Sequence, residues 1–89
     1  MLGVATRITL LLCLRAVSRV RQQRKLIGES IRQHRKQAGL SQEDLAEKAE
    51  LHPVYVGKVE RGEQWISLHA LLRIAKALGV RLRALVAEV

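Results

Sequence analysis

Residues 52–58 bring hydrogen-bonding and apolar side chains together at the start of a short predicted helix. If Val56 and Val59 face inward, the other side chains of this helix project from the opposite face. Donors on such a face, interleaved with apolar groups, can contact the edges of base pairs in the major groove of DNA. The candidate base-reading residues are His52, Val54, Tyr55, Gly57 and Lys58.

Three further residues are candidates for contact with the phosphate backbone. Gln42 begins the preceding predicted helix, whose first N–H groups lack intrahelical acceptors and whose dipole is positive at that end. Arg35 and Lys36 lie at the end of the first predicted helix, where they could flank the same backbone. Alternatively, they are only the basic end of a helix, which the helix dipole favours.

The residue pattern does not support an enzyme, a cofactor site or a metal site. Cys13 is the single cysteine, and the three histidines lie 17 or 18 residues apart, which is no common ligand spacing. No Ser/His/Asp or Cys/His arrangement, phosphate-binding glycine loop or carboxylate pair can be defended. We therefore expect a non-enzymatic protein without a cofactor or metal, in a reducing cytoplasm.

The positive charge is concentrated at the N-terminus. Residues 1–28 carry six basic side chains and no acid, whereas residues 29–89 carry ten basic and eight acidic side chains. Because the later part is nearly balanced, net charge alone is weak support for a nucleic-acid partner. Support for a nucleic-acid partner therefore depends on where the individual charges lie.

Five helical segments must position these residues. The boundaries follow from Gly39 and Gly79 as stops, from Ser41 and Ser67 as N-caps, and from Pro53 at a first helical position. Ser41 and Asp44 also fit a capping box. The predicted fold is all-α, a compact five-helix lambda-repressor-like bundle. Its segments are about 25–38, 42–49, 53–61, 68–78 and 82–89.

The second and third segments form the informative pair. Leu45, Ala46 and Ala49 face inward from one helix, and the connection to His52 is too short for antiparallel packing along the helix length. The pair must therefore cross steeply, and the small Ala46 permits close approach. This is the geometry of a helix-turn-helix.

Residues 26–86 resemble the Cro/repressor-type helix-turn-helix family, also called the xenobiotic-response-element type, along about two-thirds of the chain. The resemblance implies that Gln42 binds phosphate and braces the recognition helix, and that exposed residues between His52 and Lys58 read bases. Residues 51–53 and 66–68 also look somewhat like controller proteins of restriction–modification systems. The residues that carry the family resemblance are Gly39-Leu40-Ser41-Gln42, Leu45-Ala46, Tyr55-Val56, Lys58-Val59-Glu60-Arg61-Gly62, Ser67-Leu68 and Ile74-Ala75-Lys76-Ala77-Leu78-Gly79-Val80.

Four positions depart from the family pattern or need an alternative reading. Glu50 occupies a turn position where the family usually has Gly, so a left-handed backbone there would be strained. His34 replaces an apolar residue and is expected to be partly buried. His52 could be an N-cap rather than a DNA contact, and Trp65 is expected to pack in a loop or at a dimer interface.

Residues 1–24 form a basic, apolar N-terminal extension whose order the sequence leaves uncertain, ahead of a helix-turn-helix domain at 25–89. Its apolar run at 8–14 is too short to span a bilayer, so a membrane partner is not expected. An amphipathic arm is one interpretation, because Arg7, Arg15, Arg19 and Gln22 partly share a face. The alternatives are a disordered basic arm that adds DNA affinity, or translation that begins further along the chain.

The sequence favours a DNA-binding transcriptional regulator that acts on double-stranded DNA as a homodimer. The terminal stripe either closes the monomer's core or pairs across a two-fold axis, and we favour the dimer because half-sites need two copies. The rival interpretation is an antitoxin-like or adaptor module that uses this stripe to hold a protein partner. The predicted dimerisation residues are Leu82, Leu85, Val86 and Val89.

Overall fold

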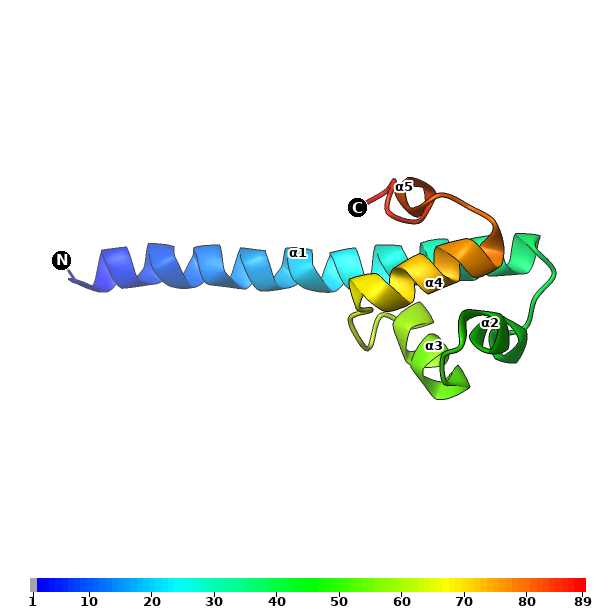
Figure 1. Cartoon of the computed structure of the whole chain (residues 1–89). Coiled ribbons are helices and arrows are strands. Elements are labelled where there is room, and N and C mark those ends of the chain that lie inside the picture. The colour runs from blue at the N-terminus through cyan, green and yellow to red at the C-terminus, as the bar shows by residue number, and fades with distance from the viewer. Residues whose placement is uncertain (1) are drawn as a thin grey trace.

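The computed structural model describes the backbone of residues 2–89 and the side chains of residue 16 and of residues 18–89. The described backbone is helical without strands, which confirms the predicted all-α class. The four C-terminal helices pack beside one end of a long first helix (Figure 1). The helices are α1 (Leu2–Gln37), α2 (Gln42–Ala49), α3 (Pro53–Glu60), α4 (Leu68–Leu78) and α5 (Leu82–Leu85).

Helix α1 is much longer than the sequence predicted. It was expected to begin near Lys25, but it runs without interruption for 36 residues from Leu2, and its N-terminal part projects beyond the bundle (Figure 1). The sequence offers no capping residue or break near residue 25, so nothing local ends the helix there. Ile27 is its first buried hydrophobic residue among the described side chains. The proposed face of the arm includes Arg7 and Arg15, whose side chains lie outside the described residues.

Within the part of the chain that the structure describes, no helix has a segment long and apolar enough to cross a membrane.

The core lies where α1, α2, α3 and α4 meet, and α5 closes it. Each helix contributes residues at helical spacing, which is why short helices of this composition can bury a continuous aliphatic interior. Several half-buried side chains, including Leu51, Tyr55 and Ile66, pack around it. The buried cluster consists of Ile27, Ile31, Leu45, Ala46, Ala49, Val56, Val59, Leu71, Ile74, Ala75 and Leu85.

Gly28 lets α1 and the end of α3 approach closely. A Cβ atom at this position would lie 2.3 Å from the carbonyl oxygen of Val59 and 2.6 Å from that of Glu60. Both neighbours are backbone atoms, which cannot turn aside as a side chain can. Glycine is therefore required where α1 crosses α3.

Side chains cap the N-termini of three helices as the sequence predicted. Ser41 accepts the backbone N–H of Asp44 at 3.0 Å, and the Asp44 carboxylate accepts the backbone N–H of Ser41 at 3.1 Å, which completes the capping box. His52 accepts the N–H of Val54, and Ser67 accepts the N–H of Ala70. The hydrogen bonds with Ser41 lower the pKa of Asp44 below its ordinary value.

Two residues that depart from the family pattern, His34 and Trp65, make contacts within the chain. His34 is half-buried, with its Nδ1 2.8 Å from the carbonyl oxygen of Ser30, which confirms the expected partial burial. The guanidinium carbon of Arg24 lies 5.9 Å from the ring centroid of Trp65, within the range of a cation–π contact. Trp65 thereby ties the loop after α3 to α1.

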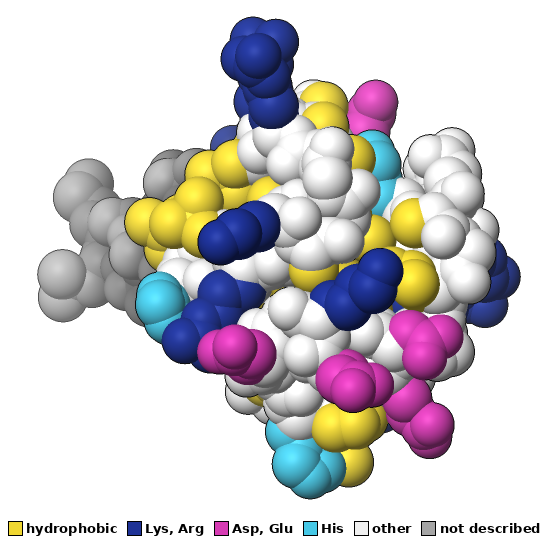
Figure 2. Space-filling model, turned by 45° about the vertical axis from the view of Figure 1, so that its right-hand side comes forward, with side chains coloured by type: hydrophobic (Ala, Val, Ile, Leu, Met, Phe, Trp, Pro, Cys, Tyr) yellow, Lys and Arg dark blue, Asp and Glu magenta, His cyan; other side chains and the backbone are white. Residues whose placement is uncertain are grey.

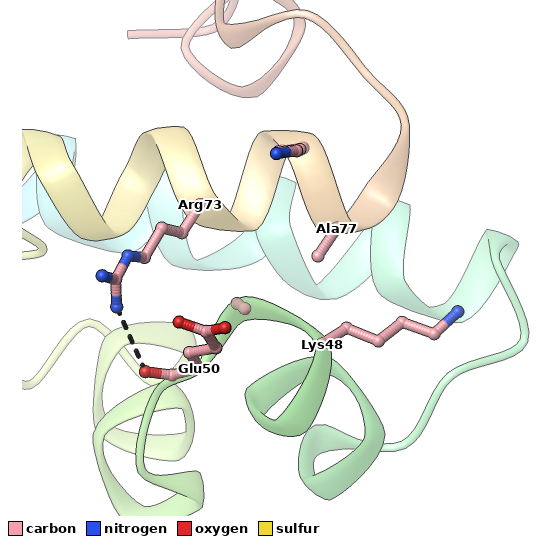
Figure 3. A pocket seen from close by; sticks show the side chains of 6 residues that line it. Lys48, Glu50, Arg73 and Ala77 are labelled. Atoms are coloured by element: carbon pink, nitrogen blue, oxygen red, sulfur yellow. Dashed lines mark hydrogen bonds between the residues drawn. The ribbon is translucent and has the colours of Figure 1, made fainter.

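The turn between α2 and α3 contains a strained residue. Glu50 has φ 55° and ψ 44°, so the predicted left-handed backbone is confirmed. Its N–H still caps α2 by reaching the carbonyl oxygens of Ala46 and Glu47. The Arg73 side chain extends from α4 and donates to the Glu50 carbonyl at 3.3 Å (Figure 3). This turn fixes the angle between α2 and α3 despite the unfavourable residue.

We predict that Glu50→Gly stabilises the protein by about 1 kcal/mol, because glycine adopts the left-handed region without a Cβ clash. For a domain of this size the melting temperature should rise by about 4–8 °C. Thermal unfolding followed by circular dichroism would measure it. As a control, Glu47→Gly places glycine inside α2 and should lower the melting temperature. If Glu50→Gly also lowers it, the left-handed turn is not strained.

Candidate nucleic-acid interface

The outer face of α3 is open to solvent from its start to its last turn. His52, Val54 and Lys58 are all exposed, and Val54 exposes 56% of its surface. His52 is the N-cap of α3: its Nδ1 accepts the Val54 N–H at 3.1 Å, and the residue is exposed. The expected N-cap is confirmed, and these three side chains remain available to a partner.

Tyr55 and Gly57 are less exposed than predicted from the sequence. The Tyr55 side chain is half-buried against the core, and its hydroxyl oxygen accepts the backbone N–H of Ser67 at 3.1 Å. Gly57 is buried, and a Cβ there would lie 3.1 Å from a guanidinium nitrogen of Arg61 and 3.3 Å from Oε1 of Gln42. The expectation that Gly57 lies on the exposed face is wrong, because two side chains cover it.

Glu60, at the end of α3, accepts hydrogen bonds from two other helices. Arg35 of α1 donates from Nε to Oε2 at 2.7 Å and from a terminal nitrogen to Oε1 at 2.9 Å. Gln42 of α2 donates from Nε2 to the same Oε1 at 3.1 Å. The Glu60 side chain is 2% exposed, so this carboxylate is held inside the protein. The bracing of α3 that the resemblance implied for Gln42 is therefore present.

Arg35 is not the surface residue that the sequence analysis expected. It is 9% exposed, and its remaining terminal nitrogen donates to the carbonyl oxygen of Leu40 at 2.9 Å. The hydrogen bond to Glu60 raises the pKa of Arg35 above its ordinary value. We correct the expected phosphate contact of Arg35 to an internal ion pair. Lys36 is exposed, and its phosphate contact stays a prediction.

The N-terminus of α2 lies beside this ion pair. The capping box uses the N–H of Asp44, whereas the N–H groups of Gln42 and Glu43 precede any carbonyl that α2 can offer them. These two groups and the positive end of the helix dipole suit an anion such as a phosphate. The carboxylates of Glu43 and Asp44 in the same turn oppose that attraction.

A shallow hollow lies against the exposed end of α3. It has a volume of about 310 Å³. Four of its lining residues belong to the predicted base-reading set, and the fifth, Gln64, comes from the turn after α3. At the lower tip of the space-filling view, histidine and hydrophobic side chains gather beside acidic ones (Figure 2). The lining residues are His52, Val54, Tyr55, Lys58 and Gln64.

A second hollow, of about 420 Å³, lies between the C-terminal end of α2 and α4 (Figure 3). Lys48, Arg73 and Lys76 line it, and Arg73 uses part of its donor capacity on the α2–α3 turn. Its lining residues from α2 come from the C-terminal end of that helix, opposite to the end at Gln42. The hollow therefore provides basic side chains that serve as controls for those on α3.

The C-terminal stripe divides between the core and the surface. Leu85 is completely buried in its own chain, so its predicted place in a dimer interface is wrong. Helix α5 packs against α1 and α4, and this contact places Leu85 in the core. Leu82 and Val86 are half-buried, and Val89 is 48% exposed.

Three residues that position or line this interface were not predicted from the sequence: Gly28, Glu60 and Gln64. Glu60 could have been found, since it lies four residues after the inward-facing Val56 and a charge on a buried stripe requires a partner. Gly28 and Gln64 carry no local signal. Their contacts depend on segments distant in the chain.

Comparison with known proteins gives one consistent result. The helix-turn-helix family model HTH_3 matches residues 31–85. Control protein C.SmaI of Serratia marcescens is 44% identical over 55 residues, which cover 62% of this chain and 66% of that protein. Control protein C.BamHI of Bacillus amyloliquefaciens is 42% identical over 59 residues, with coverages of 65% and 73%.

Among solved structures, the restriction–modification controller protein C.AhdI of Aeromonas hydrophila superposes with a TM-score of 0.69 at 42% identity. The match covers 70% of this chain and 94% of that protein. The matched stretch of C.SmaI is just under two thirds of its length, so the relatives extend beyond the shared segment. The residues matched by the family model include α2 and α3, the helices that form the interface described above.

We predict that Arg35→Ala and Glu60→Gln each destabilise the protein by about 3 kcal/mol, because each leaves a buried charge or polar group without its partner. Urea unfolding would measure the loss, and the double variant should lose less than the two single losses combined. The exposed pair Arg61–Glu63, with an N–O distance of 3.1 Å, is the matched control. Glu63→Gln should leave stability nearly unchanged. Equal losses at the two pairs would contradict the internal role of Glu60.

Proposed function

This chain belongs to the helix-turn-helix family matched over residues 31–85, and we propose that it is a DNA-binding transcriptional regulator that reads a specific operator. The observation that carries the proposal is the exposed face of α3. Its inner side is held by the bundle, whereas His52 and Val54 at the start and Lys58 in the last turn are exposed on the face that can enter a major groove. The names of the relatives, control and controller proteins, support the same function.

In the proposed complex, phosphate contacts set the orientation and α3 reads sequence. The N-terminus of α2 at Gln42 and the exposed Lys36 approach the backbone of the duplex. Gln42 is the first residue of α2, and its side chain donates to Glu60 of α3. A phosphate bound at the start of α2 would therefore be linked to the position of α3 through this one residue. Lys58 supplies a cationic donor toward a base edge.

We further propose that the protein binds its operator as a homodimer. A two-fold symmetric operator requires two recognition helices about one helical turn of DNA apart. With Leu85 inside the core, the surface that remains for a second copy consists of Leu82, Val86 and Val89, next to the C-terminus. Side chains at this edge could pack against their own symmetry mates, as a two-fold interface demands.

Operator binding is expected to depend on Lys58 and not on basic residues outside the proposed interface, such as Lys76. Random duplexes retained by the full chain would be sequenced, and the affinity for the selected site measured by fluorescence anisotropy. Lys58→Ala should cost about 1–3 kcal/mol of binding free energy. Lys76→Ala is the matched control, because Lys76 is exposed on α4 beside the second hollow. Equal affinity of the Lys58 and Lys76 variants, or binding that does not weaken with salt, would contradict the proposal.

The dimer is expected to sediment as two copies at the concentrations at which DNA binding is measured. Val89→Asp should shift the protein toward monomer in analytical ultracentrifugation and weaken operator binding, because the charge would be buried in the interface. Ala87→Asp is the control, since Ala87 is exposed but off the stripe. A wild-type protein that binds its operator as a monomer would contradict this part of the proposal.

A further inference from the structure

The hollow at the start of α3 combines an apolar surface with a rim of hydrogen-bonding groups. Val54 is 56% exposed although it is a β-branched aliphatic residue, and it lines the hollow together with the Tyr55 side chain. An exposed valine beside an aromatic ring leaves apolar surface in contact with water. Binding of an apolar group would remove this surface from water, which is favourable.

The walls of this hollow are fixed before any ligand arrives. Tyr55 is held by its hydroxyl, which accepts the Ser67 N–H at 3.1 Å, and by packing against the core. His52 is held by the cap bond from the Val54 N–H. Because Nδ1 is the acceptor there, the neutral ring carries its proton on Nε2 and offers a donor outward. Ordering these side chains therefore costs little on binding.

Gln64 adds an amide, which both donates and accepts, to the residues that line the hollow. Its side chain is exposed and lines the hollow from the turn after α3, across from residues of the helix itself. Lys58 and His52 can only donate in this arrangement. An amide beside an apolar surface matches a base pair that presents a methyl group together with a donor and an acceptor.

Only one natural pair has that pattern in the major groove. An A·T pair presents the thymine C5-methyl, with the N6 donor and N7 acceptor of adenine beside it, and a glutamine amide can bond both adenine atoms. We propose that Val54 and Tyr55 bind the C5-methyl of a thymine and that Gln64 reads the paired adenine. Gln64 is then a specificity residue outside the recognition helix. This inference rests on the proposed operator binding.

The test uses the full chain and the operator selected by it. Each thymine of a half-site is replaced in turn by uracil, which keeps every hydrogen-bonding group and removes only the methyl. One replacement should weaken wild-type binding about fourfold, the effect of one buried methyl group. Val54→Ala should lose most of the difference between the thymine and uracil duplexes, because only Tyr55 still contacts the methyl group. Leu72→Ala is the control, because Leu72 is also exposed, at 48%, but lies on α4 away from the hollow.

The adenine opposite that thymine is then replaced by 7-deazaadenine, which lacks the N7 acceptor. Wild-type binding should weaken, and Gln64→Ala should no longer distinguish the two duplexes. If uracil has no effect at any position, or if Val54→Ala keeps the discrimination, the methyl assignment is overturned. If Gln64→Ala still responds to the deaza base, the role of Gln64 is overturned. Failure to select any operator would instead refute the proposed function itself.

Discussion

The carboxylate of Glu60 connects three helices, and the position of α3 depends on it. Arg35 binds it with two hydrogen bonds from α1, and Gln42 binds it from α2. A buried ion pair adds little net stability compared with apolar packing, but removal of one partner is costly. The pair therefore acts mainly on geometry: an α3 placed at another angle would leave the carboxylate or the guanidinium without a partner.

An eight-residue helix with an internal glycine cannot hold itself in water, so α3 takes its structure from its surroundings. Gly28 allows the α1 backbone to contact its last turn, and Tyr55 connects its first turn to the start of α4. These contacts all lie on its inner side or at its ends. The side chains of Val54 and Lys58 on the outer face are consequently not needed to hold α3 in place. The residue types at these two positions can therefore differ according to the DNA sequence that is bound.

Local signals predicted the parts of this fold that local chemistry decides. Ser41, His52 and Ser67 cap helices where the sequence placed them, and Glu50 is left-handed as its place in the turn implied. Apart from the bracing of α3 by Gln42, which the family resemblance implied, hydrogen bonds between distant segments were not predicted. Arg35 and Leu85 were placed at the surface, whereas the bundle buries them, because an ion pair or a filled gap depends on what lies opposite.

Protection of the operator from dimethyl sulfate would test the central claim most directly, because this reagent methylates guanine N7 in the major groove and adenine N3 in the minor groove. If α3 enters the major groove of two half-sites, guanine N7 atoms should be protected in two clusters about 10 base pairs apart, while adenine N3 stays reactive between them. Protection of adenine N3 alone, or a single unbroken region without guanine protection, would contradict the account.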